Sequence, residues 1–129
     1  MLLFEVRLNE HREMVPEGCL RAVAGLRAVS RLEEEGYHSI VFRNDLDGAR
    51  RKVSEAIDVL RDVCLDLPAD ACKNIMDRLR ELSRFLGEQR SARELKEFPI
   101  EAGTYNWIRR DFGQALKEAW DILMFRCLG

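Results

Sequence analysis

Residues 46–67 read LDGARRKVSEAIDVLRDVCLDL, and residues 72–86 read CKNIMDRLRELSRFL. Both stretches repeat apolar residues every three or four positions, the spacing that places side chains on one face of an α-helix. Pro68 separates the two stretches and Gly87 closes the second. Because the connection around Pro68 is short, we expect two long helices in an antiparallel hairpin. The apolar positions are Leu46, Ala49, Val53, Ile57, Leu60, Cys64 and Leu67, then Cys72, Ile75, Met76, Leu79, Leu82 and Leu86.

The sequence before this hairpin has a different pattern. Residues 2–8 alternate apolar and polar side chains, which predicts a half-buried strand. Pro16 is typical of a first helical turn, and the apolar spacing predicts a helix over residues 16–35, ended by Gly36. Residues 37–43, YHSIVFR, are β-branched and aromatic and precede the turn-prone pair Asn44-Asp45, so they predict a second strand.

The sequence after the hairpin contains two further helical patterns. Residues 91–94, SARE, form a capping-box pattern, which predicts a short helix that reaches Phe98 and is stopped by Pro99. Residues 101–104 contain Gly103 and predict a loop, with Thr104 as the N-cap of a last helix over residues 105–127.

These elements predict one α+β domain over residues 1–129 that is predominantly α. In this arrangement an N-terminal strand–helix–strand unit packs on a bundle of three long helices. An all-α bundle with extended N-terminal segments is the alternative.

Composition fits a folded domain: 47% of the residues are hydrophobic, and the formal net charge is −2. This charge predicts no preference for nucleic acid, and no stretch has the length of a membrane-spanning helix. The four cysteines show no CxxC spacing and no export signal precedes them, so we interpret them as reduced thiols of a cytoplasmic protein. Cys64 and Cys72 flank the Pro68 turn and can approach each other in space.

Acidic residues form the most enzyme-like pattern of the chain. Glu33 and Glu34 end the first predicted helix, and Glu55 and Asp58 lie one turn apart on the next. This set resembles that of the MazG-type nucleotide pyrophosphohydrolases, helical proteins with a glutamate pair followed by Glu-x-x-Asp. The resemblance implies a Mg²⁺ site and nucleotide hydrolysis, provided that the four side chains converge. In the family the helix continues after the glutamate pair and carries a further glutamate. This chain departs from that pattern, because it has Gly36 and Tyr37 at those positions. The alternative is that Glu55 and Asp58 pair with nearby arginines on a solvated helix face.

Other catalytic and cofactor motifs are missing from the sequence. His11 and His38 have no partner at a fixed spacing, and the glycines form no phosphate-binding loop. We therefore predict no catalytic residue, no metal and no cofactor.

Basic residues recur on the helices. Arg80 and Arg84 lie on one side of the third predicted helix, and Arg109 and Arg110 near the start of the last. If they converge they could bind the phosphates of a nucleic acid. Because acidic residues are interleaved with them, we favour a solvated face with ion pairs.

The last helix gives the sharpest indication of function. Apolar residues in its final turns, among them Met124, Phe125 and Leu128, spread around most of its circumference, so we expect them to be buried on more than one side or to contact a partner. Trp107 falls opposite the core stripe and is either covered by the 101–103 loop, which we favour, or an interface anchor.

These observations favour a small, non-enzymatic, intracellular interaction protein, such as a regulator, inhibitor or adaptor. We expect it to act through a hydrophobic helical surface, with a protein partner or by self-association. The candidate interaction residues are Trp107, Met124, Phe125, Leu128, Arg80, Arg84, Arg109 and Arg110. The MazG-like hydrolase and the arginine-mediated nucleic-acid binder are the alternatives.

Overall fold

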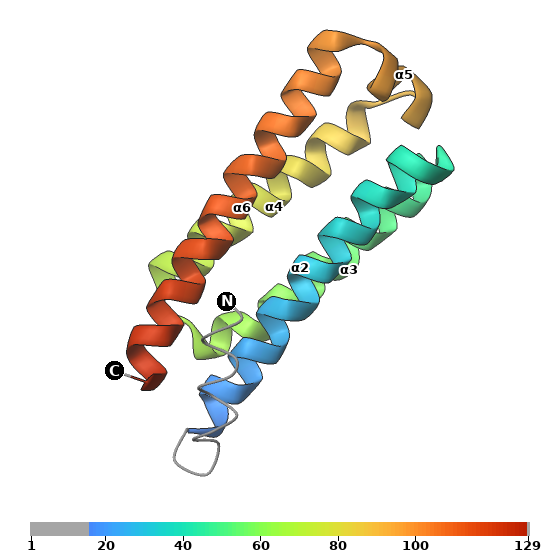
Figure 1. Cartoon of the computed structure of the whole chain (residues 1–129). Coiled ribbons are helices and arrows are strands. Elements are labelled where there is room, and N and C mark those ends of the chain that lie inside the picture. Colours follow the sequence, from blue (N-terminus) through green and yellow to red (C-terminus); the bar gives the residue numbers. More distant parts are fainter. Residues whose placement is uncertain (1–15, 129) are drawn as a thin grey trace.

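The computed structural model describes residues 16–128, and these residues form an antiparallel helical bundle (Figure 1). Helix α2 (Glu17–Arg43) and helix α3 (Leu46–Val63) form one pair. A short 3₁₀ turn, η2 (Cys64–Asp66), leads to α4 (Ala69–Glu88), which packs with the last helix, α6 (Pro99–Leu128). The six-residue helix α5 (Ala92–Glu97) connects α4 to α6. The four long helices run up, down, up and down, so α2 and α6 are neighbours without a connecting loop.

The predicted strand over residues 37–43 is wrong, because these residues are the last two turns of α2. Gly36 does not end the helix: it is buried, and a Cβ atom there would lie 3.4 Å from the carbonyl oxygen of Ala49. Gly25 lies even closer to α3, since an added Cβ would overlap the side chain of Val63. The glycines of α2 therefore allow α3 to approach closely. This packing buries Ile40 completely and overrides the β propensity of its neighbours.

The turn between α2 and α3 uses the residues that the sequence marked as turn-prone. Asn44 has a φ of 51° in the left-handed region, and the backbone N–H of Asp45 donates to the carbonyl of Ser39 over 2.9 Å. The Asp45 side chain then accepts a hydrogen bond of 2.8 Å from the N–H of Gly48 and caps α3. One residue thus ends α2 and the next begins α3.

The predicted hairpin around Pro68 is present: α3 and α4 pack against each other and run in opposite directions. The N-cap of the predicted short helix is also present, because the hydroxyl of Ser91 accepts a hydrogen bond of 3.1 Å from the N–H of Glu94. The loop predicted over residues 101–104 is wrong. Helix α6 begins at Pro99, whose fixed φ suits a first helical turn, and runs through Gly103.

The described helices share one hydrophobic core. Its largest fully buried side chains come from every long helix and from α5: Leu26, Ile40, Leu60, Ile75, Leu79, Leu82, Leu86, Leu95 and Leu123. The α+β prediction is therefore corrected to the all-helical alternative, since residues 16–128 contain no strand. The strand predicted over residues 2–8 lies outside the described residues. Within the described part, no helix is long and apolar enough to cross a membrane.

Candidate functional site

A buried ion pair joins α2 to α6 midway along the bundle. The Glu33 carboxylate accepts two hydrogen bonds from the Arg109 guanidinium, from Nε over 2.6 Å and from Nη2 over 3.3 Å. The Glu33 side chain is 8% exposed and that of Arg109 is 23% exposed. This forked geometry is the strongest form of carboxylate–arginine pairing, and it fixes how α6 rests on α2.

Aromatic rings surround this pair. The Arg109 guanidinium carbon lies 3.7 Å from the centre of the Tyr37 ring, a cation–π contact. The Tyr105 ring lies 6.3 Å from that of Tyr37 and stacks on Phe85 of α4 at 6.0 Å. Burial raises the pKa of the Tyr105 hydroxyl well above its usual range. Burial disfavours the charge of Arg109, but the hydrogen bond and the charge of Glu33 more than offset this, so the guanidinium pKa is raised.

An open pocket of about 380 Å³ lies on the same α2–α6 interface. Six residues of α2 line it, together with Trp120 of α6, whose ring is nearly buried. The lining from α2 consists of Arg27, Ser30, Arg31, Glu34, Glu35 and His38. The pocket is thus polar on one wall and apolar on the other.

The acidic residues of the MazG-like pattern do not converge. Glu33 is held by Arg109, whereas Asp58 pairs with Arg61 on the exposed face of α3, with 2.9 Å between Oδ1 and Nη1. Within residues 16–128, no three His, Cys, Asp or Glu side chains lie close enough to hold a metal ion. The geometry therefore supports the solvated-face alternative for α3 and gives the hydrolase hypothesis no site.

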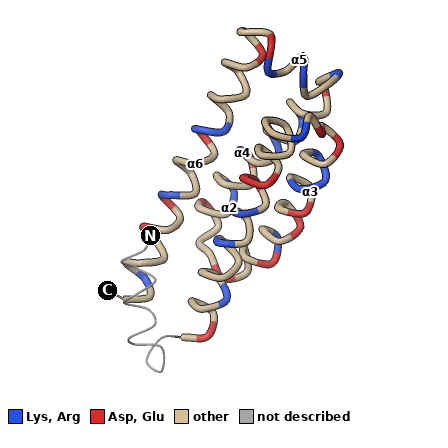
Figure 2. The backbone as a smooth tube through the Cα atoms, turned by 45° about the vertical axis from the view of Figure 1, so that its right-hand side comes forward, with Lys and Arg blue, Asp and Glu red and all other residues tan. Residues whose placement is uncertain are grey.

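The basic residues do not gather on one surface either. Arg109 points into the bundle, Arg110 covers the ring of Trp107 at 4.7 Å, and Arg80 and Arg84 are exposed on α4. Figure 2 shows basic and acidic positions interspersed along the described helices, as the sequence indicated. This arrangement lacks the continuous positive surface that phosphate binding requires.

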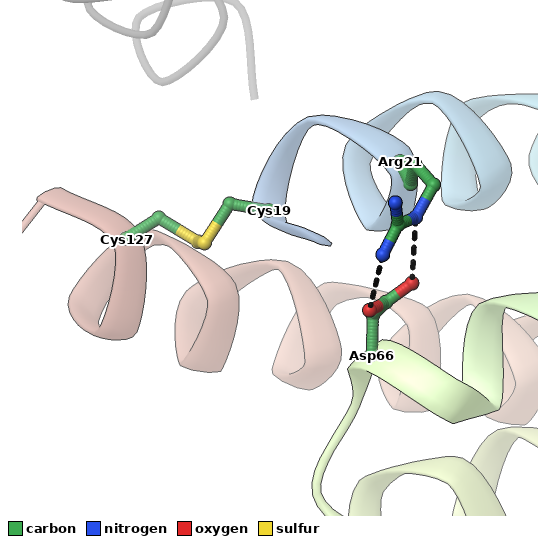
Figure 3. The surroundings of a disulfide bond; sticks show 4 residues. All are labelled: Cys19, Arg21, Asp66 and Cys127. Atoms are coloured by element: carbon green, nitrogen blue, oxygen red, sulfur yellow. Dashed lines mark hydrogen bonds and ion pairs between the residues drawn. A yellow bond between two sulfur atoms is a disulfide. The ribbon is translucent and has the colours of Figure 1, made fainter. Parts of the chain in front are cut away.

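The four cysteines form two disulfides, so the prediction of reduced thiols is wrong. Cys19 at the start of α2 is bonded to Cys127 at the end of α6, with 6.1 Å between the Cα atoms (Figure 3). Cys64 of η2 is bonded to Cys72 of α4, with 5.2 Å between the Cα atoms. Local spacing could not reveal the first bond, because only the antiparallel packing of the first and last described helices brings its two residues together.

The outer face of α6 carries three large apolar side chains in one line. Ile100 is 80% exposed, Trp107 61% and Phe125 80%. Trp107 lies seven residues after Ile100 and eighteen before Phe125, and both intervals are close to whole numbers of helical turns. The expectation that residues 101–103 cover Trp107 is wrong, since they belong to the same helix.

The end of α6 is also less buried than its composition predicted. Leu123 faces the core, but Met124 is 37% exposed, Phe125 lies in solvent and Leu128 is half-buried. These last turns are therefore covered on one side only. Of the two alternatives for this segment, burial on several sides is wrong within the described chain, and contact with a partner stays a prediction.

Sequence reasoning missed the ion pair of Glu33 with Arg109. A detectable signal was present, because Glu33 falls among the apolar positions of its helix and Arg109 lies next to the apolar stripe of α6. A charge on a core face needs an opposite charge nearby. No protein-family model, no curated protein and no solved structure matches this chain.

Proposed function

We propose that this chain is a non-enzymatic interaction domain that binds another protein through the outer face of α6, defined here by Ile100, Trp107, Arg110, Met124 and Phe125. The observation that carries the proposal is Trp107, which is 61% exposed and carries the Arg110 guanidinium over its ring. Tryptophan and arginine are the residue types most enriched among side chains that dominate binding energy. A rigid indole ordered by a neighbouring guanidinium loses little entropy when a partner covers it.

The distribution of the apolar residues supports a protein as the partner. Ile100 and Trp107 lie about 10 Å apart along the helix axis, and Trp107 and Phe125 about 27 Å apart, at 1.5 Å per residue. Between them Lys117 and Asp121 form an ion pair, with 3.2 Å between Nζ and Oδ2. Apolar contact points spread over this length, with polar residues beside them, suit an extended protein surface better than a small ligand.

Roles as a regulator, inhibitor or adaptor stay within this proposal, and self-association is one outcome of its test. A cytoplasmic location was expected from reduced thiols, and the two disulfides remove that argument. Disulfides persist in oxidising compartments and in the intracellular proteins of hyperthermophiles. We propose that the domain works in one of these settings.

The test compares three versions of the full chain as affinity baits: the unchanged protein, Trp107→Ala and the control Leu65→Ser. Leu65 is 85% exposed but lies on η2, outside the face of α6 defined above. We expect a partner that binds the unchanged protein and Leu65→Ser equally and binds Trp107→Ala at least about 30-fold more weakly, as for a dominant interface residue. Sedimentation of the same proteins shows whether that partner is a second copy. Equal binding to all three proteins, or no binding by a protein that stays monomeric, contradicts the proposal.

A further inference from the structure

The interface between α2 and α6 has no chain connection along its length. The α2–α3 pair lies beside the α4–α6 pair, and no loop joins α6 directly to α2 (Figure 1). The open pocket of about 380 Å³ runs along this interface. Separation of the final turns of α6 from α2 would therefore leave the turns between the other helices unchanged.

Two specific links hold this interface. The ion pair of Glu33 with Arg109 lies midway, and the bond between Cys19 and Cys127 closes the end. Arg109 and Cys127 are eighteen residues apart on α6, about 27 Å of helix at 1.5 Å per residue. Trp120 lies within this span, is 3% exposed and lines the pocket.

The two sides of the Cys19–Cys127 bond are not held equally. Arg21, half a turn after Cys19, donates to Asp66 of η2 over 3.4 and 3.5 Å, so the start of α2 is tied to the turn below it (Figure 3). On the other side, Met124, Phe125 and Arg126 are exposed. If the disulfide is cleaved, the end of α6 is the element that can move.

The second disulfide has no such role. Cys64 and Cys72 are eight residues apart within the α3–α4 hairpin, whereas Cys19 and Cys127 are 108 residues apart. Reduction of the local bond leaves its two cysteines adjacent through the short turn. Reduction of the distant bond removes the only disulfide cross-link between α2 and the end of α6 within the described chain.

We propose that the Cys19–Cys127 disulfide is a redox-controlled link whose reduction separates the last turns of α6 from α2. A dithiol is the reductant. One of its thiolates attacks a sulfur of the Cys19–Cys127 bond, which breaks to give a mixed disulfide and one protein thiolate. The second thiolate of the reductant then displaces the other cysteine and closes a disulfide in the reductant. The protein gains two electrons and two protons, and the reductant loses them. All four cysteine side chains are partly exposed, so a dithiol can reach either bond.

Tryptophan fluorescence tests this link without knowledge of any partner. The chain has two tryptophans, and Trp107→Phe leaves Trp120 as the only one. Dithiothreitol is added to this variant, and mass spectrometry follows which bond is reduced. We expect the emission of Trp120 to move to longer wavelength and its quenching by acrylamide to rise once Cys19–Cys127 is reduced. Both changes should reverse on reoxidation, while far-UV circular dichroism keeps most of its helical signal.

Two further variants in the Trp107→Phe background assign the response to one bond. Cys64→Ser/Cys72→Ser should keep the full response, and Cys19→Ser/Cys127→Ser should show the shifted emission without dithiothreitol and no further change with it.

Three results would overturn the proposal: a Trp120 signal that stays constant while Cys19–Cys127 is reduced, a bond that dithiothreitol does not reduce in the folded protein, or loss of all helical signal on reduction. Because none of these readouts involves α6 binding to a partner, the proposed function can fail while this link stands.

Discussion

The two ends of the bundle are stabilised by different chemistry. The disulfide end, defined by Cys19, Cys64, Cys72 and Cys127, holds the start of α2, the turn between α3 and α4 and the end of α6. The α5 end, defined by the α2–α3 turn, α5 and the start of α6, has no cysteine and is held by hydrogen bonds to backbone carbonyls. There Arg50 of α3 donates to the carbonyls of Leu86 and Gln89 over 3.0 and 2.8 Å. Lys96 of α5 donates to the carbonyl of Val41 in α2 over 3.2 Å.

Topology explains this difference. At the α5 end the chain itself makes both connections, between α2 and α3 and from α4 through α5 to α6. At the disulfide end it makes only one, through η2, and two helix ends have no connection within the described residues. A cross-link between those two ends closes the longest loop of the bundle and so restricts the unfolded chain more than a link at the α5 end would.

Removal of the disulfides should change the stability of the two ends by the largest amount. Chain-entropy estimates give about 5 kcal/mol for the bond that closes 108 residues and about 2.5 kcal/mol for the bond that closes eight. We expect Cys19→Ser/Cys127→Ser to lower the free energy of unfolding by more than Cys64→Ser/Cys72→Ser does, as measured by urea denaturation of oxidised proteins. Equal losses would show that the two bonds do not act through loop closure.

The ion pair between the two ends should give the next largest effect. Arg109→Met leaves the buried Glu33 carboxylate uncompensated, and we expect a loss of about 3 kcal/mol. Glu33→Met should cost less, about 1–2 kcal/mol, because Arg109 is 23% exposed and can reach water. The double variant should lose less than the two single losses combined, which urea denaturation of all four proteins would measure. Additive losses would contradict the pairing.

Sequence patterns predicted the parts of this molecule that depend on local spacing. The stripes of α3 and α4, the Pro68 hairpin and the Ser91 cap all follow from neighbours in sequence. The errors lie where distant residues decide the structure. Residues 37–43 are helical because α3 packs against them, and Cys19 reaches Cys127 because α6 returns beside α2. No spacing rule within one segment contains that information.

The exposure of Trp107 was missed for a local reason. Gly103 indicated a loop, yet the helix continues from Pro99, because a glycine on an exposed helix face weakens a helix without ending it. The candidate site on α6 could therefore be located in the sequence by its apolar residues, but which of them face solvent could not.

At the α5 end, Arg50→Ala should cost about 1–2 kcal/mol. It removes the side-chain donor to two carbonyls, that of Leu86 in the last turn of α4 and that of Gln89 directly after the helix. Arg51→Ala is the matched control, since Arg51 is exposed on the same helix and should change stability by less than about 0.5 kcal/mol. Thermal unfolding of both variants measures the difference. If the two variants unfold alike, the carbonyl contacts of Arg50 do not stabilise this end.

The smallest effect concerns the ion pair of Glu35 with Lys52, which joins α2 to α3 with 3.0 Å between Oε2 and Nζ. The hydrogen bond from Lys52 lowers the pKa of the Glu35 carboxyl below its usual range. A lowered folded-state pKa means that this stabilisation is complete above the unfolded-state pKa and is lost as the pH falls through the folded-state pKa.

Because the Glu35 side chain is 40% exposed, Glu35→Gln should cost less than about 1 kcal/mol at pH 7. The melting temperatures of Glu35→Gln and the unchanged protein should converge at acidic pH, with Glu34→Gln as the exposed control on the same helix. A difference that stays constant from neutral to acidic pH would contradict the assignment of this stabilisation to a charged Glu35.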